Sequence, residues 1–301
     1  MNKAILLNGE LALEKIRQIL IYLLLLSSIT EFIGVLLENT DLAKTASILG
    51  KSTFYMLIAI LVYTLYSGEK GIFIIGGLGL TGSLDVMLKT ILKMPRPPSS
   101  EWLIKVEGPG FPSGHAAMSF SFALLAGYAT RNPLIALALF IHAFAVSDSR
   151  LVLHVHYPID VVGGAILGVV VALLSVILYI CFNNPGKYLV SITIPSLIAS
   201  IISSIEMPEY TDAPLLTGLS LGALLSGLLI IKTNNEFLYI DRWLFKAISL
   251  FTAFTGSVIV FILESINIYP AVLMAGSVFS ILVLMSRLIA YEIIKHLGRT
   301  Q

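Results

Sequence analysis

The feature that most constrains this chain is a succession of apolar runs, each about as long as a bilayer is thick. A helix needs about 20 apolar residues to cross the hydrocarbon core. Of the 301 residues, 57% are hydrophobic and 12% are charged, whereas about 25% of the residues of a soluble domain are charged. Most of the chain must therefore face lipid or other apolar helices. The composition predicts an all-α, polytopic membrane helix bundle.

Ten segments reach the length of a membrane span or come close to it. They are residues 17–37, 50–67, 71–93, 114–130, 133–150, 157–182, 187–205, 212–231, 243–264 and 269–291. A polar stretch at 182–187 separates a part with six helices, which contains the polar motifs described below, from a part with about four helices and no such motif. We therefore expect a six-helix core over residues 1–182 and additional transmembrane helices of unknown role over residues 183–301.

The distribution of Lys and Arg predicts the orientation of this bundle. With the N-terminus inside, the inner segments hold twelve Lys and Arg and the outer segments hold seven, of which three belong to the motifs described below. Because cytoplasmic loops of membrane proteins carry an excess of Lys and Arg, both termini are expected in the cytoplasm. The polar motifs would then open to the extracytoplasmic face of the cell membrane.

Net charge and cysteine content say little about partners. The net charge is +1, so no nucleic-acid partner is expected. The single cysteine, Cys181, cannot form an internal disulfide. The oligomeric state is not indicated by the sequence.

Three short polar signatures lie at the edges of apolar segments between residues 89 and 160. They read Lys89-x6-Arg96-Pro97, Pro112-Ser113-Gly114-His115 and Ser149-Arg150-x5-His156-x3-Asp160. Together they supply three cations, two imidazoles, a carboxylate and a hydroxyl. This is the set of groups needed to hold a phosphate and to attack it with a histidine.

Lys89, Arg96 and Arg150 are the candidate phosphate-binding cations. A guanidinium offers a planar fork that matches phosphate, and a lysine offers a point charge. Alone, Lys89 or Arg96 would more often be an interfacial anchor, with its charged end in water. Their coincidence with the other two signatures favours phosphate binding.

The second signature opens a helix at residue 114. Helix N-termini direct free N–H groups at anions, Gly114 lets a ligand approach the backbone, and Ser113 can donate a hydroxyl hydrogen bond. A plain N-cap role for Ser113 is compatible with this function. His115 faces the same opening and could protonate a departing oxygen.

His156 and Asp160 are four residues apart at the start of a helix, so they share a face. The carboxylate can accept a hydrogen bond from one imidazole nitrogen and direct the other at phosphorus. His154 and His156 could instead form a metal pair, but no second cluster of carboxylates and histidines accompanies them. We therefore expect no metal and no other cofactor, and treat His154 as peripheral.

Three further polar residues lie in or beside apolar segments, where a charge is costly. Asp85 lies one helical turn before Lys89, so we expect the two to pair. Glu31 is also expected to have a structural partner. His142 is interpreted as a hydrogen-bonded packing residue.

The three signatures together resemble those of the type 2 phosphatidic acid phosphatase superfamily, which includes lipid phosphate phosphatases, polyprenyl diphosphate phosphatases and glucose-6-phosphatases. The resemblance covers about residues 1–182. It implies a six-helix core, metal-independent hydrolysis and a phosphohistidine on His156. Asp160 would orient that histidine and His115 would be the acid for the leaving group. The phosphate would be bound by Lys89, Arg96, Ser113, Gly114 and Arg150.

The resemblance and the composition together predict an integral-membrane phosphatase acting on a membrane lipid. The preferred substrate is a polyprenyl diphosphate. The alternatives are a phosphatidate-type or sugar-phosphate monoester, or transfer of the phosphate to a sugar or lipid acceptor. A transporter or flippase is an alternative of another class, because ten helices can form a pathway.

Overall fold

The computed structural model describes residues 3–207, 212–233, 235–240, 243–264 and 269–299. Within these ranges the regular structure is helical and no strand is present, which confirms the all-α prediction. The α-helices are α1 (Lys3–Leu36), α2 (Thr40–Leu49), α3 (Ser52–Leu61), α4 (Gly68–Leu92), α5 (Gly114–Thr130), α6 (Pro133–Val152), α7 (Pro158–Phe182), α8 (Pro185–Glu206), α9 (Asp212–Lys232), α10 (Trp243–Glu264) and α11 (Tyr269–Arg299). A π-helix, η1 (Val62–Tyr66), follows α3, and short 3₁₀ turns form η2 (Ser99–Glu101) and η3 (Glu236–Tyr239).

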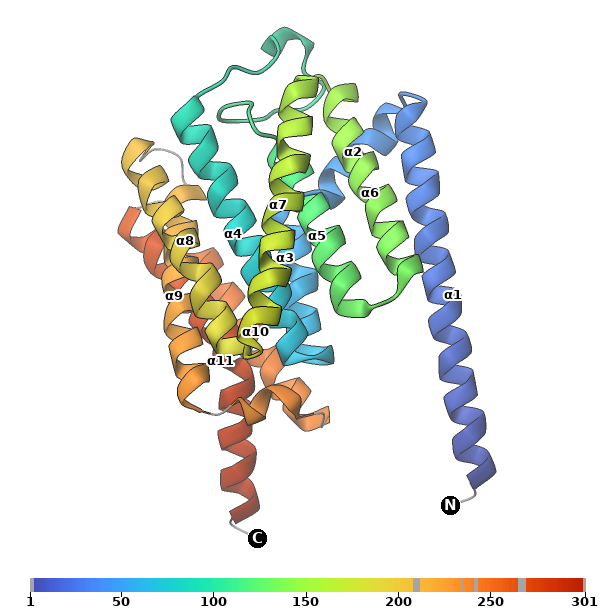
Figure 1. The fold of residues 1–301 in the computed structure, drawn as a ribbon, viewed down its shortest axis with the longest axis vertical. Coiled ribbons are helices and arrows are strands. Elements are labelled where there is room, and N and C mark those ends of the chain that lie inside the picture. The colour runs from blue at the N-terminus through green and yellow to red at the C-terminus, as the bar shows by residue number, and fades with distance from the viewer. Residues whose placement is uncertain (1–2, 208–211, 234, 241–242, 265–268, 300–301) are drawn as a thin grey trace.

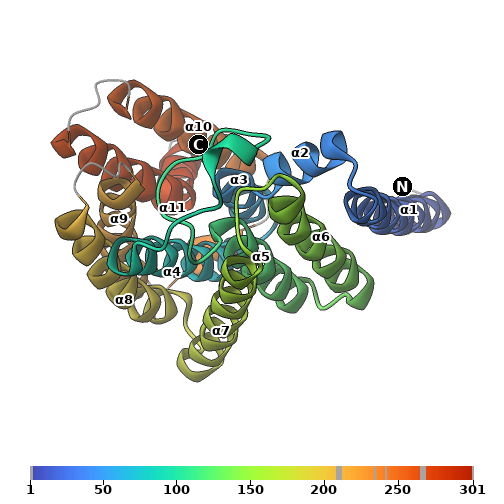
Figure 2. The same ribbon diagram turned by 90° about the horizontal axis from the view of Figure 1, so that it is seen from above.

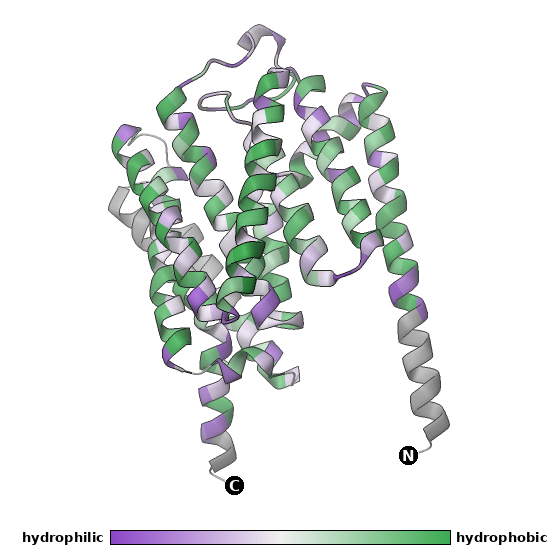
Figure 3. Ribbon diagram, viewed as in Figure 1, coloured by the Kyte–Doolittle hydropathy of each residue, from purple (hydrophilic) through white to green (hydrophobic). Residues whose placement is uncertain are grey.

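The chain is a multi-pass membrane protein. Among the described residues, seven helices are long and apolar enough to cross a membrane, and the number is eight if α2 with α3 and η1, a pair bent by 50°, counts as one span. Exposed apolar side chains continue along the outward face of α7, for example Val162, Ile166 and Val170. In Figure 3, hydrophobic residues cover most of the length of the helices, and many of the hydrophilic residues lie toward the helix ends and in the connections. In Figure 1 both termini lie at the same end of the bundle.

The helix boundaries follow from local chemistry. Asn132 precedes Pro133 and accepts hydrogen bonds from the backbone N–H groups of Leu134 (2.9 Å) and Ile135 (3.1 Å). A capping side chain at this position satisfies donors that have no partner inside the helix, and proline fits the first turn. The helix before it, α5, ends at Thr130, and the next residue, Arg131, adopts the left-handed conformation (φ 53°) at the C-cap.

Helix α2 lies between the first two predicted spans, residues 17–37 and 50–67, where the sequence pattern predicts no helix. The structure instead shows a short helix, capped by the Asn39 side chain, that buries Ala43, Ala46 and Ser47. These positions are three and four residues apart and so lie on one face. The helix is too short to resemble a span, and its polar residues Asp41 and Lys44 are exposed.

Helix α4 lies at the centre of the bundle, between the two groups of helices seen in Figure 2. Its residues Ile72, Phe73 and Leu78 belong to the main apolar core, together with Phe122 of α5 and Tyr188 of α8. The α8–α11 helices lie on one side of α4, and α1, α2 and α6 lie on the other (Figure 2). The division at residue 183 into a core and a second region stays a prediction.

Small residues allow the helices to approach closely. A Cβ added to Gly164 would lie 2.3 Å from the backbone oxygen of Ser113, and one added to Gly168 would lie 2.2 Å from that of Ala117. These glycines therefore bring α7 directly against the backbone of α5, the packing expected of small residues in membrane helices. This contact holds the first turn of α5 beside α7.

A buried arginine joins the C-terminal helices to the π-helix. Arg287 of α11 is 1% exposed. Its Nε donates to the backbone oxygen of Tyr63 and its Nη1 to that of Leu238, both at 2.7 Å. The π-helix leaves the regular i→i−4 pattern, and the guanidinium satisfies one of its carbonyls. These hydrogen bonds from the guanidinium to backbone carbonyls connect segments that are distant in the sequence. Within a membrane protein, backbone groups that water cannot reach need partners from the protein itself.

Candidate active site

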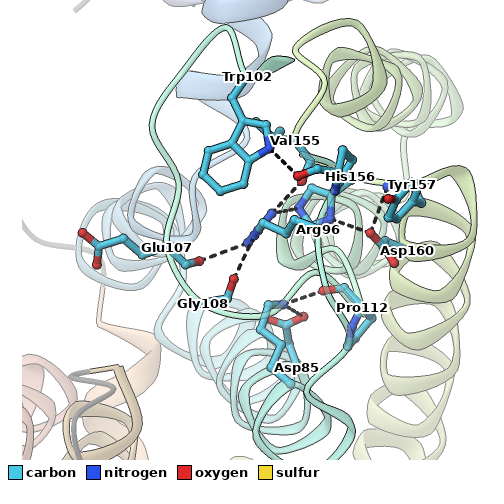
Figure 4. A network of polar contacts seen from close by, with 12 residues as sticks. Asp85, Arg96, Trp102, Glu107, Gly108, Pro112, Val155, His156, Tyr157 and Asp160 are labelled. Carbon is cyan, nitrogen blue, oxygen red and sulfur yellow. Dashed lines mark hydrogen bonds and ion pairs between the residues drawn. The ribbon is translucent and has the colours of Figure 1, made fainter. Parts of the chain in front are cut away.

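The three polar signatures meet at the end of the bundle that lies away from the termini, under the loop that joins α4 to α5 (Figures 1 and 4). The eight predicted site residues come from four helices and two connections. Lys89 is in the last turns of α4, Arg96 in the loop, Ser113, Gly114 and His115 at the start of α5, Arg150 near the end of α6, His156 in the turn before α7, and Asp160 in the first turn of α7.

His156 and Asp160 form a buried pair, as their spacing predicts. The His156 Nδ1 lies 3.2 Å from the Asp160 Oδ2, and the two residues are 5% and 1% exposed. The same oxygen accepts the backbone N–H of Tyr157 at 2.9 Å. An ionised carboxylate only accepts hydrogen bonds, so the proton of the neutral imidazole is on Nδ1. The Nε2 atom therefore carries the lone pair.

Burial keeps His156 neutral at physiological pH. The pKa of the imidazole is lowered to about 4: burial is the largest cause, the cations Arg96, Arg150 and Lys89 act in the same direction, and the hydrogen bond to Asp160 opposes them. Desolvation disfavours the charged form of a buried histidine. A neutral imidazole with a free Nε2 is the form that can act as a nucleophile.

Arg96 lies directly over this nitrogen (Figure 4). Its Nη1 is 2.8 Å from the His156 Nε2 and 2.9 Å from the backbone oxygen of Val155. The other side of the guanidinium donates to the backbone oxygens of Gly108 (2.9 Å) and Glu107 (3.1 Å). Because a guanidinium only donates hydrogen bonds, this contact agrees with a lone pair on Nε2. The loop thus holds a cation next to the candidate nucleophile.

Lys89 is held between α4 and the start of α5. Its Nζ donates to the Asp85 Oδ1 and to the backbone oxygen of Pro112, both at 2.5 Å. The expected pairing of Lys89 with Asp85 is therefore confirmed. A Cβ on Gly114 would lie 2.7 Å from the Asp85 Oδ2, so this position requires glycine in order for α5 to begin against the buried ion pair.

Two buried donors in the site have no hydrogen-bond partner among the described residues. They are the Ser113 Oγ and the Arg150 Nε, and these residues are 0% and 2% exposed. Ser113 occupies the N-cap position of α5, but its side chain makes no capping hydrogen bond. An unsatisfied buried polar group costs about 1–3 kcal/mol. Both donors, together with the N-terminus of α5, fit an anion.

Ser47 of α2 also contacts the site and was missed by sequence reasoning. Its hydroxyl accepts a hydrogen bond from the Arg150 Nη1 at 2.5 Å, and its backbone oxygen lies 3.1 Å from the His115 Nε2. The spacing of Ala43, Ala46 and Ser47 could have indicated a helix with one buried face. Nothing in the sequence marks Ser47 itself, because it belongs to none of the three signatures.

The remaining polar residues named above lie outside the site. His154 is exposed and adopts the left-handed conformation (φ 55°). His142 bonds through Nδ1 to the Glu31 Oε2 (2.7 Å) and through Nε2 to the Tyr55 hydroxyl (3.1 Å), so both expected structural roles are confirmed. Within the described ranges, no three His, Cys, Asp or Glu side chains are arranged to hold a metal ion.

Part of this sequence is shared with known proteins. The model of the PAP2 superfamily, the type 2 phosphatidic acid phosphatases, matches residues 70–187. A decaprenylphosphoryl-5-phosphoribose phosphatase of Mycobacterium tuberculosis is 30% identical over 122 residues, which are 39% of this chain and 67% of that protein. The chain belongs to the PAP2 superfamily. No solved structure matches it.

A second PAP2 relative matches a shorter region. The lipid A 4'-phosphatase of Bacteroides thetaiotaomicron is 44% identical over 61 residues, which are 20% of this chain. The aligned part spans about a quarter (27%) of that relative's length. The region matched by the PAP2 model contains all three signatures and runs from α4 into α8. Helix α2, with Ser47, lies outside it.

Proposed function

We propose that this PAP2 protein is an integral-membrane phosphatase that hydrolyses a lipid phosphate or diphosphate through a phosphohistidine on His156. The single observation that carries the proposal is the His156 Nε2, which bears a lone pair beside the Arg96 guanidinium. The unpartnered donors of Ser113 and Arg150 support it. The names of both relatives describe phosphatases.

In the first step, the Nε2 of His156 attacks phosphorus while the bond from phosphorus to the leaving oxygen breaks. His115 gives a proton to that oxygen, and Asp160 stabilises the positive charge that develops on the phosphorylated imidazole. In the second step, water attacks phosphorus, His115 takes a proton from the water, and the bond between nitrogen and phosphorus breaks. Inorganic phosphate leaves and both histidines return to their starting forms.

Positive charge for the phosphoryl oxygens comes from the protein in this proposal. The Arg96 guanidinium contacts the His156 Nε2 at 2.8 Å, and Lys89 and Arg150 also lower the pKa of His156 by their charge. Phosphoryl transfer depends mostly on positioning and on neutralising charge at the oxygens. We therefore expect activity without a divalent metal ion.

The substrate is proposed to be a lipid whose phosphate reaches the site while its tail stays in the membrane. The loop above the site packs through Trp102 and Ile104 on an apolar cluster that includes Val35 of α1 and Ala43 of α2. Leu103 is 45% exposed and provides an apolar contact at the same level. Among lipids, we retain a polyprenyl diphosphate as the preferred substrate.

A lipid-linked sugar phosphate is the second candidate substrate. It is favoured by a specific observation: the Mycobacterium tuberculosis relative is named as a phosphatase of decaprenylphosphoryl-5-phosphoribose. Transfer of the phosphate to a sugar or lipid hydroxyl would use the same intermediate. We place the site on the extracytoplasmic face and both termini in the cytoplasm, on the distribution of Lys and Arg.

The test is phosphate release by the purified full-length protein in detergent with excess chelator. The panel comprises a polyprenyl diphosphate, a polyprenyl monophosphate, a lipid-linked sugar phosphate and a soluble sugar phosphate. His156→Ala should abolish both release and acid-labile labelling of the protein from ³²P-substrate. His154→Ala is the matched control and should stay active. Loss of activity on chelation, restored by one divalent ion, would refute the proposed mechanism.

A further inference from the structure

Ser47 lies outside the region matched by the family model, residues 70–187, yet it contacts two residues of the proposed site. The contacts differ in kind. Its side chain accepts from the guanidinium of Arg150, and its main-chain oxygen faces the imidazole of His115. One residue thus connects the phosphate-binding group with the proposed acid.

The end of α2 explains why the Ser47 carbonyl is available. In a continuing helix this oxygen would accept the N–H of Lys51, four residues on. Instead the N–H of Lys51 donates to the Ile48 oxygen at 3.3 Å, because α2 ends at Leu49 and the chain bends by 50° into α3. The last carbonyls of a helix need partners from outside it. The His115 Nε2 supplies one.

Gly50 fixes the position of this helix end. A Cβ at residue 50 would lie 2.3 Å from the Val146 Cγ1, so only glycine lets the end of α2 rest on α6. The backbone N–H of Gly50 donates to the Ala46 oxygen at 2.8 Å. The close approach of α2 to α6 therefore sets where the Ser47 carbonyl and hydroxyl lie.

The carbonyl contact determines which proton His115 can transfer. A carbonyl oxygen only accepts hydrogen bonds, so the Nε2 of His115 must carry a proton in this arrangement. The protonated imidazole then holds its second proton on Nδ1. The Nδ1 proton is therefore the one available for a leaving group. The hydrogen bond to the Ser47 carbonyl keeps the imidazole ring oriented while His115 transfers that proton.

The hydroxyl contact orients Arg150. Within the described part of the chain, the Ser47 Oγ is the one hydrogen-bond partner of this guanidinium, and its Nε is buried without one. A flexible side chain held at one end presents its remaining donors in a fixed direction. Preorganised donors of this kind are what phosphate binding requires.

We infer that Ser47 is a positioning residue for the reaction, whose hydroxyl sets the phosphate-binding Arg150 and whose carbonyl sets the proton-donating His115. This inference rests on the proposed function, because it assumes that the site binds and hydrolyses a phosphate. It predicts two separable effects, since a side-chain substitution removes the hydroxyl and leaves the carbonyl in place.

The experiment compares full-length variants by inhibition with inorganic phosphate and by turnover of aryl and alkyl phosphate substrates. Ser47→Ala should raise the inhibition constant of phosphate about tenfold, the loss of one hydrogen bond to a charged group, with an unchanged ratio of aryl to alkyl turnover. Ser47→Thr keeps the hydroxyl and should restore phosphate binding. Thr45→Ala, on the exposed face of α2, is the matched control.

The carbonyl is tested by moving the end of the helix. Gly50→Ala should lower the turnover of both substrates unequally. The factor by which turnover falls should be at least ten times larger for the alkyl substrate, because its leaving group needs a proton, than for the aryl substrate. The double variant Gly50→Ala with Val146→Ala makes room for the added methyl group and should restore the ratio. Thermal unfolding of each variant shows whether it is folded. Ser47→Cys replaces Ser47→Ala if the latter does not fold.

The outcomes are distinguishable. A wild-type protein that releases no phosphate from any substrate refutes the proposed function itself. An active wild type with the same phosphate inhibition in Ser47→Ala and Thr45→Ala overturns the role of the hydroxyl. Equal loss on aryl and alkyl substrates in Gly50→Ala overturns the role of the carbonyl.

Discussion

Replacing Asp160 with asparagine should leave a slow enzyme rather than a dead one. The Asp160 Oδ2 accepts hydrogen bonds from both the His156 Nδ1 (3.2 Å) and the Tyr157 N–H (2.9 Å), while the buried Oδ1 has no hydrogen-bond partner among the residues that the structure describes. Asparagine offers one oxygen and one NH₂ group, so it must place one of them at each of these two positions.

The costs of the two placements decide between them. With the amide oxygen at the Oδ2 position, both bonds survive and one buried NH₂ is left unsatisfied, at about 1–3 kcal/mol. In the reverse placement, the NH₂ group lies at the Oδ2 position and faces the N–H of Tyr157, which is also a donor. That N–H and the amide oxygen are then both left without a hydrogen-bond partner. The first placement is therefore favoured, and the proton stays on the Nδ1 of His156.

Asp160→Asn thus keeps the tautomer and loses the negative charge. Hydrogen bonds to charged groups contribute about 1–2 kcal/mol more than neutral ones, so the rate of phosphohistidine formation should fall roughly 5–30-fold. The unsatisfied amide is present in the ground state and in the transition state, so it lowers the stability of the protein and not this rate. Asp160→Ala removes both bonds, and a loss of about 10³–10⁴ is expected, the scale seen when a histidine loses its orienting carboxylate.

The assay is single-turnover labelling of the protein with ³²P-substrate, quenched over milliseconds to minutes. It measures the first chemical step apart from release of the product. Equal losses in Asp160→Asn and Asp160→Ala would show that the charge, and not the tautomer, is what matters, and the reasoning from the two bonds to one oxygen would be wrong.

Three further results are expected. First, protonation removes the lone pair of His156, whose pKa is lowered to about 4; with an aryl phosphate, whose leaving group needs no proton from His115, labelling should be constant from pH 7 to about pH 5 and fall below that, and an acidic limb near pH 6.5 in the free enzyme would contradict this. Second, Arg287→Met should destabilise the protein by about 3 kcal/mol or more, because it leaves buried carbonyls without charged donors, as measured by thermal unfolding in detergent. Third, in a Cys181→Ser background, since Cys181 is exposed, a cysteine in the 98–110 loop should react with an impermeant thiol reagent in intact cells. One replacing Arg131 should react only after permeabilisation, and the reverse pattern would place the site in the cytoplasm.

Much of the proposed site could be predicted because its residues come in short signatures on helix ends. The spacing of His156 and Asp160 places them on one helical face, and Asp85 lies one turn before Lys89. Such local geometry follows from 3.6 residues per turn. The apolar runs likewise predicted most of the helices, since length and composition suffice for that.

The contacts that were missed depend on how distant segments fold back on one another. Ser47 reaches the site through the abrupt end of a short helix, and its contact with His115 uses a backbone oxygen, which carries no sequence signal. The contact between Arg96 and His156 depends on the path of the loop, where the carbonyls of Glu107 and Gly108 hold the guanidinium. Propensity and periodicity describe neither feature.

Helix α4 carries Lys89 toward the site while one of its sides supports the helices that follow residue 183. A Cβ on Gly76 would meet the Ile192 Cγ2 at 2.9 Å, and the Ser83 hydroxyl bonds to that of Ser196 at 2.7 Å. Gly76 and Ser83 thus form a stripe of small and polar residues on the side of α4 that packs on α8. In a family member without α8 to α11 this stripe would face lipid, where bulky apolar residues pack better. The third span of a PAP2 sequence should therefore reveal whether the chain continues beyond six helices: glycine and serine on that side belong to long members, and leucine, isoleucine and phenylalanine to short ones. Sorting family members by this stripe alone, and then counting their spans, would show how far the correspondence extends.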